Sequence, residues 1–296
     1  MKSKKHGLLQ FQFFSYYKSM SIKKYIKRGL NYILTGVPIK DIRAQVVYLS
    51  PNHRLSGKKI ILTGGGRGLG AAMCDKFVAE GAEVLIVGRN ENSLKKQSMK
   101  SGCKFMVLDV NDVEKFPDFI NKAAELLGGV NCLVNNAGIS LHEGGIHQVS
   151  LNSYEQQFNT NLRAAYFLSQ QFIIHCIKEN IGCADLLFVS SERGDFVDVI
   201  PYGLTKAALN SLVQGLAHDY IRRGIRCNAI APGVTASDLT GYKTTDNLFC
   251  KYNMNERVYF PEEMAEVACF LLSDASRCIN GQIITCNEGK SVNNIR

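Results

Sequence analysis

The sequence predicts an α/β domain built on a parallel, doubly wound sheet. From residue 58 onward, short apolar runs alternate with longer amphipathic segments, an order typical of βαβ units with right-handed crossovers. The short runs show little polar–apolar alternation, as expected where helices cover both faces of a sheet. At 296 residues, the chain is long enough for one such domain with a sizeable core.

Seven apolar runs are the predicted strands, each buried on both faces: Ile60–Leu62, Glu83–Val87, Lys104–Leu108, Asn131–Val134, Asp185–Val189, Arg226–Ile230 and Gln282–Cys286. The predicted helices are Leu69–Glu80, Ser93–Ser101, Val113–Leu127, Tyr154–Asn180, Tyr202–Arg223 and Pro261–Ser273. The polar stretch 235–260 interrupts this alternation. Because a long segment without structure of its own is often a functional lid, we expect a lid here; a packed surface excursion is the alternative.

The positive charge of the chain is confined to its N-terminal part. The formal net charge is +9, but residues 1–59 hold 13 Lys and Arg against one acid, Asp41, and the remainder holds 22 against 25. We therefore divide the chain into a basic extension, 1–57, and a catalytic domain, 58–296. The domain itself gives no electrostatic reason to expect a nucleic-acid partner.

The extension contains one amphipathic stretch, residues 20–37. Its apolar side chains follow one helical stripe, formed by Ile22, Tyr25, Ile26, Leu30, Ile33 and Val37. Its basic side chains lie largely off that stripe: Lys23, Lys24, Lys27 and Arg28. Packing on the domain or on another subunit is the favoured interpretation. Contact with an anionic membrane surface and a mobile tail are the alternatives.

The cellular compartment and the metal content are inferred from apolar runs and from the spacing of the cysteines. The chain has no run of about 18 apolar residues, and we do not expect its N-terminal stretch to be a signal peptide. Its ten cysteines include no Cys-x-x-Cys pair and no Cys/His cluster. We therefore expect reduced, mostly buried thiols, no metal site and a cytoplasmic protein.

A glycine-rich turn follows the first predicted strand and opens a helix. It reads Thr63-Gly64-Gly65-Gly66-Arg67-Gly68-Leu69-Gly70. Glycines at 64, 68 and 70 permit a tight turn and let the backbone approach a pyrophosphate at the helix N-terminus. The turn therefore predicts a dinucleotide site, although its glycine spacing is wider than that of the commoner dinucleotide-binding fingerprint.

The end of the second strand bears on which nicotinamide cofactor binds. An acid there would accept from the ribose 2′-OH of NAD, but the sequence is Val87-Gly88-Arg89-Asn90. Arg67, in the glycine turn, is a second cation. Two guanidinium groups suit a 2′-phosphate, so NADP(H) is favoured. NAD(H), with Arg89 as a solvated loop residue, is the alternative.

Tyr202 and Lys206 are the strongest candidates for chemistry. They stand four residues apart on a predicted helix, and therefore on one face of it. The ammonium is expected to lower the phenol's pKa from about 10, so that Tyr202 can exchange a proton with a substrate oxygen. Ser191, eleven residues upstream, could hold that oxygen by a hydrogen bond.

The ordered set of motifs resembles the short-chain dehydrogenase/reductase family over roughly Lys58–Lys290. The set comprises the glycine turn, Asn135-Asn136-Ala137-Gly138, Asn161, then Ser191, Tyr202 and Lys206, then Pro232-Gly233. The resemblance implies one Rossmann-type domain with a seven-stranded parallel sheet, in which 235–260 covers the substrate.

The same resemblance implies roles for individual residues. Tyr202 would be the general acid/base, Lys206 its pKa partner and ribose ligand, and Ser191 the group that orients the substrate. Asn161, in a long helix that an amide could kink, would help to hold a proton-relaying water. Further cofactor contacts would come from Thr63, Gly64, Gly66, Arg67, Gly68, Leu69 and Gly70; from Arg89, Asp109 and Val110 around the adenosine; from Asn135, Ala137 and Gly138 on the ribose side; and from Pro232, Gly233, Val234 and Thr235.

Two departures from the family pattern stand out. The segment between Ser191 and Tyr202 is short and carries four charged residues, Glu192, Arg193, Asp195 and Asp198. These charges suggest a polar substrate that is sugar-like or acidic, and His142 and Glu143 could add to the same pocket. The alternative is that all of these residues are surface charges. Ser190 is the rival of Ser191, although in the family's Ser-Ser-x-x-Gly pattern the second Ser acts. After the last strand, Cys286-Asn287-Glu288-Gly289-Lys290 replaces an acid followed by two glycines, a change expected to alter only local packing.

These features predict an NADP(H)-dependent oxidoreductase that interconverts a small-molecule carbonyl and a secondary alcohol. An NAD-preferring alcohol or sugar dehydrogenase is the alternative within the family, and a non-catalytic dinucleotide-binding sensor or scaffold is the alternative outside it. We also expect a homodimer or homotetramer. The two long helices carry apolar residues beyond those that one sheet face can cover: Tyr166, Phe167, Phe172, Ile173, Leu212 and Leu216.

Overall fold

The computed structural model describes residues 30, 33–34, 53–245 and 247–292. The chain divides into two units, Met1–Lys40 and Asp41–Arg296, and the second carries the fold described below. Of the amphipathic stretch 20–37, Leu30, Ile33 and Leu34 are helical and the rest lies outside the described residues. In the described parts of the chain, no helix has the length and apolar character needed to cross a membrane. The predicted limits, 1–57 and 58–296, stay predictions.

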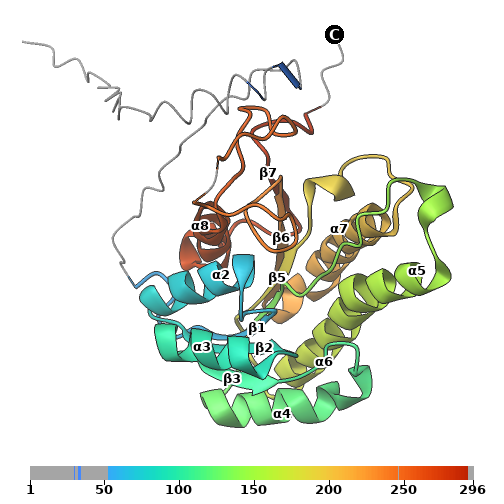
Figure 1. Ribbon diagram of the computed structural model, residues 1–296. Coiled ribbons are helices and arrows are strands. Elements are labelled where there is room, and N and C mark those ends of the chain that lie inside the picture. Colours follow the sequence, from blue (N-terminus) through green and yellow to red (C-terminus); the bar gives the residue numbers. More distant parts are fainter. Residues whose placement is uncertain (1–29, 31–32, 35–52, 246, 293–296) are drawn as a thin grey trace, which may run out of the picture. The chain divides into compact units, whose positions relative to one another are not determined.

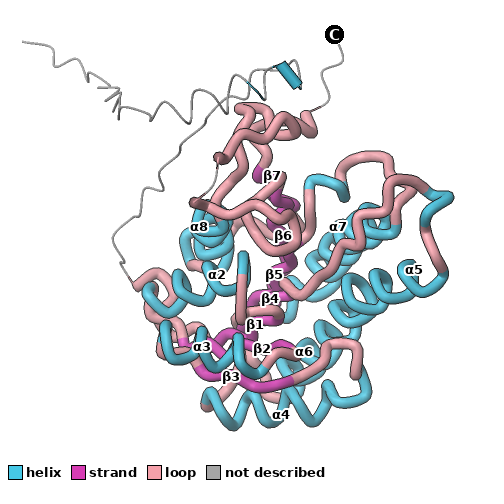
Figure 2. Tube along the Cα trace, in the orientation of Figure 1, coloured by secondary structure: helices cyan, strands magenta, loops and turns pink. Residues whose placement is uncertain are grey.

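Seven parallel strands form one sheet in the order β3-β2-β1-β4-β5-β6-β7 (Figure 2). They are β1 Lys59–Thr63, β2 Glu83–Gly88, β3 Lys104–Val107, β4 Cys132–Asn135, β5 Ala184–Val189, β6 Ile225–Pro232 and β7 Ile283–Cys286. All seven predicted strands are therefore present. The central strand β1 pairs with both β2 and β4, since Ile61 is opposite Leu85 on one side and Leu133 on the other.

Helices cover both faces of this sheet (Figure 1). They are α2 Gly68–Ala79, α3 Glu91–Ser101, α4 Phe116–Leu127, α5 Leu151–Phe158, α6 Ala164–Lys178, α7 Pro201–Tyr220 and α8 Pro261–Leu272. Their ends follow local chemistry. Asn90 caps α3 by accepting from Ser93 N at 2.9 Å, α7 and α8 begin at a proline, and α3 and α4 end at the left-handed glycines 102 and 128.

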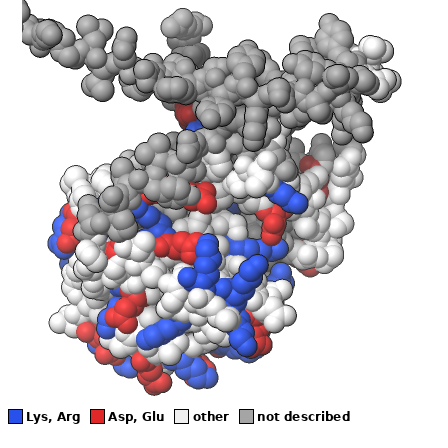
Figure 3. Space-filling model, turned by 60° about the vertical axis from the view of Figure 1, so that its left-hand side comes forward, with Lys and Arg blue, Asp and Glu red and all other residues white. Residues whose placement is uncertain are grey.

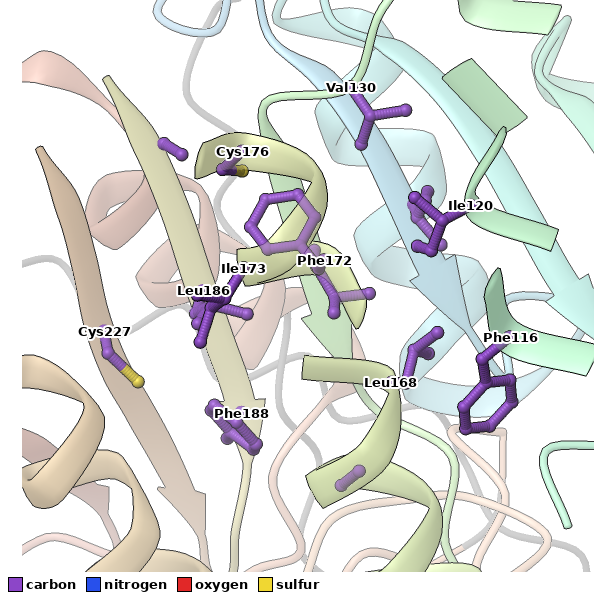
Figure 4. Packing of buried hydrophobic residues seen from close by; sticks show 14 of the residues in the cluster. Phe116, Ile120, Val130, Leu168, Phe172, Ile173, Cys176, Leu186, Phe188 and Cys227 are labelled. Carbon is purple, nitrogen blue, oxygen red and sulfur yellow. The ribbon is translucent and has the colours of Figure 1, made fainter. Parts of the chain in front are cut away.

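Alternate residues of each inner strand enter two separate cores. Ile61 of β1 belongs to the core under α4, α6 and α7, whereas Ile60 and Leu62 belong to the core under α2 and α8. Figure 4 shows part of the first core, in which side chains of α4 and α6 meet those of β5 and β6: Phe116, Ile120, Leu168, Phe172, Ile173, Cys176, Leu186, Phe188 and Cys227. This double burial explains why the strand sequences are continuous apolar runs.

Two sequence-based expectations about burial are wrong. The edge strands β3 and β7 are not buried on both faces, because each has a neighbour on only one side and less helix cover. Phe172 and Ile173 are core residues, so neither is left over for a subunit contact. Tyr166 and Phe167, at 47% and 37% exposure, do remain at the surface of α6.

The stretch 235–260, in which residue 246 is not described, has more structure of its own than the sequence indicates. It contains the antiparallel bridges Ser237–Tyr242 and Phe249–Arg257. A small apolar cluster lies inside it: Ala236, Leu248, Cys250, Val258 and Phe260. Its role as a lid stays a prediction.

Candidate active site

The glycine turn lies at the carboxyl end of β1, where the strand order changes direction between β1 and β4. Gly64 has a φ of 67°, and a Cβ on Gly70 would lie 2.1 Å from the carbonyl oxygen of Gly64, so both positions require glycine. The first turn of α2 has no acidic residue and no side-chain cap. Its free amides and partial positive charge therefore suit a pyrophosphate, and the residues present fit a dinucleotide.

Asn136 joins this turn to the turn after β4. Its side-chain amide donates to Thr63 O at 2.8 Å, and the backbone amides of Asn136 and Ala137 both donate to Thr63 Oγ1 at 3.0 Å. The sequence motif Asn135-Asn136-Ala137-Gly138 includes Asn136 but gave it no predicted role, although the doubled asparagine after a buried strand was the available signal. Thr63 thus positions both turns of the predicted cofactor site.

Several predicted cofactor residues line one small cavity of about 10 Å³ behind these turns. They are Thr63, Val110, Asn135 and Ala137, and they face helical residues that include Thr160 and Ala164. Asn135 is buried, and its amide donates to Ser169 Oγ on α6 at 2.9 Å. Its side chain therefore anchors β4 to α6.

The two cations expected at the adenosine end are exposed and already paired. Arg89 Nη1 lies 3.7 Å from Asp109 Oδ2, and Arg67 Nη1 lies 3.1 Å from Asp238 Oδ2. Exposed pairs of this kind are weak, so a phosphate could compete for either guanidinium. Figure 3 shows basic and acidic side chains interspersed over the face that it presents, and this mixture matches the near-balanced charge of the domain.

Lys206 is buried beside Tyr202 on α7. Its Nζ lies 5.6 Å from the centre of the Tyr202 ring and donates to Val189 O at 2.8 Å. A Cβ on Gly138 would lie 3.6 Å from that Nζ and 3.4 Å from Asn161 Oδ1, so these residues meet as the sequence predicts. Burial lowers the pKa of Lys206 from 10.5 to about 8.

Ser191, and not Ser190, faces the phenol. Ser191 lies near enough to the Tyr202 side chain to oppose the rise in its pKa, and its hydroxyl accepts from Arg193 N at 3.2 Å. Ser190 is turned toward α7, where its hydroxyl donates to Asn210 Oδ1 at 2.6 Å. The geometry therefore favours the second serine.

The expected lowering of the pKa of Tyr202 by Lys206 is wrong for this structure. Burial raises the pKa of Tyr202 above its ordinary value of 10, although the residue as a whole is only partly buried. The hydrogen bond with Ser191 and the charge of Arg193 oppose this rise, whereas the charge of Glu192 adds to it. Lys206 does not reverse the effect, because its ammonium is directed at Val189 O and is itself destabilised by burial.

Asn161 lies in a distortion of the helix, as its sequence context suggests. Residues Asn159–Arg163 form a π-helical turn between α5 and α6. The buried Asn161 amide accepts from Ile139 N at 2.8 Å and donates to Ile139 O at 2.9 Å and Thr205 Oγ1 at 3.2 Å. Thr205 Oγ1 in turn donates to Tyr202 O at 2.7 Å. Asn161 therefore connects the turn after β4 to the first turn of α7.

Most of the charged residues near the presumed substrate face already have partners. Arg193 Nε donates to Asp198 Oδ2 at 2.7 Å, and Asp195 accepts from Asn210 and Thr285. His142 Nε2 lies 2.9 Å from Leu239 O of the stretch 235–260. Glu143 accepts from Gln157 at 2.7 Å. These interactions fix the loops around the site.

The turn after β6 packs closely against the stretch 235–260. A Cβ on Gly233 would lie 2.8 Å from Tyr259 Cε2. Asn253 accepts from Val234 N at 3.2 Å and donates to Val234 O at 2.9 Å. Asn253 is a second positioning residue missed from the sequence, and it holds the predicted cofactor segment Pro232–Thr235.

Dehydrogenases and reductases are among the known proteins that this chain resembles. Residues 64–291 match the family described as enoyl-(acyl carrier protein) reductase. The chain is 32% identical over 250 residues to gluconate 5-dehydrogenase of Gluconobacter oxydans, covering 80% of this chain and 96% of that protein. It is 31% identical over 251 residues to 2,5-dichloro-2,5-cyclohexadiene-1,4-diol dehydrogenase of Sphingobium indicum, covering 81% and 98%. A short-chain dehydrogenase of Burkholderia cenocepacia, solved in complex with NADP, superposes with a TM-score of 0.69 at 27% identity, covering 79% and 98%.

Proposed function

Because the chain belongs to the short-chain dehydrogenase/reductase family of NAD(P)-dependent oxidoreductases, we propose that it interconverts a carbonyl compound and a secondary alcohol with NADP(H). The observation that carries this proposal is the position of Lys206 one helical turn from Tyr202 on α7, with its Nζ 5.6 Å from the centre of the phenol ring and 2.8 Å from Val189 O, at the end of the strand that leads to Ser191. These groups lie at the carboxyl edge of the sheet, the edge at which α/β folds place ligands.

Each residue has a defined task in carbonyl reduction. Tyr202 Oη gives its proton to the substrate oxygen, while Ser191 Oγ donates a second hydrogen bond to that oxygen. The raised pKa keeps Tyr202 protonated at neutral pH, as a proton donor must be. When bound, the nicotinamide supplies the hydride.

The cofactor is held by the two turns at the switch in strand order. Amides at the start of α2 bind the pyrophosphate, and Lys206 binds the nicotinamide ribose. Arg67 and Arg89 bind the 2′-phosphate, because each is exposed and only weakly paired. Preference for NADP(H) over NAD(H) rests on these two arginines.

The substrate is proposed to carry hydroxyl groups. Two relatives are named for a sugar acid and for a cyclic diol, and both substrates are alcohols. The half-exposed Arg193 beside Ser191 keeps part of its guanidinium free for a polar substituent. The alternative of a non-catalytic sensor is disfavoured by the intact group of Ser191, Tyr202 and Lys206.

The test is a Tyr202→Phe variant assayed with NADPH and a panel of keto sugars, cyclic ketones and β-ketoacyl thioesters. Loss of the hydroxyl should lower turnover by about 10²–10⁴-fold, the usual range for general acid/base catalysis, with little change in NADPH affinity. Tyr220→Phe, at the far end of the same helix, is the matched control. Wild-type turnover in Tyr202→Phe would refute the assignment, and absence of turnover across the panel in the wild type would favour the sensor.

A further inference from the structure

A segment after β7 contacts the loop that carries Ser191. Lys290 Nζ lies 2.6 Å from Glu192 Oε1, and Asn287 Nδ2 donates to Glu192 Oε2 at 3.1 Å. Thr285 Oγ1 donates to Asp195 Oδ2 of the same loop at 2.8 Å. Both carboxylate oxygens of Glu192 are therefore satisfied by residues about 95 positions further along the chain.

This segment coincides with one of the departures from the family pattern. Asn287 and Lys290 belong to the sequence that replaces an acid and two glycines, and Asn287 is almost fully buried. Lys290 Nζ also lies 5.7 Å over the ring of Phe196. The replacement therefore places an amide and a cation against the catalytic loop.

The position of Glu192 makes these contacts relevant to the reaction. Glu192 directly follows Ser191 and is only 5% exposed. A buried carboxylate without a counter-ion is strongly unfavourable, so the loop depends on Lys290 and Asn287 to keep Glu192 in place. Its negative charge also acts on Tyr202, since it opposes formation of the phenolate.

Other charges face Tyr202 from two directions. Arg193, in the same loop as Glu192, favours the phenolate and is itself paired with Asp198. Lys206 approaches from Tyr202's own helix. Among the described residues, Lys290 is the cation paired with Glu192. The net charge that acts on the Tyr202 phenol therefore depends on whether Lys290 neutralises Glu192.

We propose that Lys290 is a positioning residue that neutralises Glu192, fixes the Ser191 loop and sets the pH range in which Tyr202 exchanges protons. This inference rests on the proposed role of Tyr202. Its test, however, reads the ionisation of Tyr202 directly and needs no substrate.

The experiment is an alkaline titration of phenolate absorbance on the full chain. Each protein is compared with its own Tyr202→Phe derivative, so that the difference reports Tyr202 alone. Lys290→Met should move the Tyr202 midpoint upward, because Glu192 then acts without the part of its screening that the Lys290 ammonium supplies. Glu192→Gln should move it downward, and the double variant should return it close to the wild-type value.

Two controls separate charge from packing. Lys290→Arg keeps the charge and should leave the midpoint near that of the wild type. Lys122→Met removes an exposed lysine that is paired with Asp118, and it should have no effect. If Lys290→Met does not fold, Glu192→Gln decides the question, since it leaves no buried carboxylate without its counter-ion.

An unchanged midpoint in Glu192→Gln, or equal midpoints in Lys290→Met and wild type, would overturn the proposal. Neither result would contradict the proposed oxidoreductase function, which is tested separately by measuring the turnover of the Tyr202→Phe variant. If a substrate is found, the pH profile of kcat/KM should move in parallel with the titration. A uniform loss of rate without a shift would indicate a packing role only and would also overturn the proposal.

Discussion

Replacing Lys206 by Met should make the protein more stable at neutral pH while removing its activity. The lysine is buried, and its pKa falls from 10.5 when unfolded to about 8 when folded. A depressed lysine pKa means that the folded state disfavours the charged form. A difference of about 2.5 units corresponds to about 3 kcal/mol at 1.36 kcal/mol per unit, and the folded state bears this cost below about pH 8.

The variant also loses a favourable contact. Met cannot donate to Val189 O, and an unsatisfied buried carbonyl costs about 1–3 kcal/mol. The net expectation at pH 7 is a gain of roughly 1 kcal/mol in the free energy of unfolding. As pH rises from about 8 to 10.5, the wild-type lysine discharges and its penalty disappears. The difference between the proteins should therefore shrink and then change sign.

Urea unfolding of both proteins between pH 7 and pH 10.5 measures this difference directly. Other titrating groups are common to the two proteins and cancel in the comparison. Lys122→Met, a surface substitution, should show no such pH dependence. A Lys206→Met protein that is less stable than wild type by the same amount at every pH would refute the argument, because its loss would then be packing alone.

Two further predictions concern cofactor choice and assembly. NADPH should bind more tightly than NADH, and Arg89→Asp should reverse or abolish that preference, because the carboxylate repels a 2′-phosphate and accepts from a free 2′-OH. Fluorescence titration measures both affinities, and equal values in the wild type would disprove the prediction. The protein should form a homodimer or homotetramer through the apolar hollow of about 470 Å³ that Tyr166, Phe167 and Leu212 help to line. Phe167→Glu should therefore lower the mass measured by light scattering. A monomeric wild type at micromolar concentration would contradict the prediction.

The fold was predictable because each inner strand of the sheet is buried by helices on both faces. Runs such as Ile60–Leu62 alternate between two cores, so neither face of the strand shows a polar pattern. The edge strands were misjudged because sequence order does not reveal which strands end up at the edges. A local distortion of the helix at Asn161 was predicted from an amide residue inside a long helical pattern, and the structure has a π-helical turn there.

The candidate site was predictable where spacing along one element fixes the geometry. Tyr202 and Lys206 meet because four residues make one helical turn. The direction of the Tyr202 pKa shift was not predictable, since it depends on burial and on where Lys206 directs its ammonium. Asn136 and Lys290 act through partners on other elements, and local spacing cannot show such long-range pairs.

The contact between Lys290 and Glu192 also has a consequence for biosynthesis. The two residues are 98 positions apart, and all seven strands precede Lys290 in the chain. Because chains are made and begin to fold from the N-terminus, the sheet can form before the Ser191 loop acquires its counter-ion. A released chain that is truncated after Cys286 should therefore retain all seven strands but lack the counter-ion of the catalytic loop.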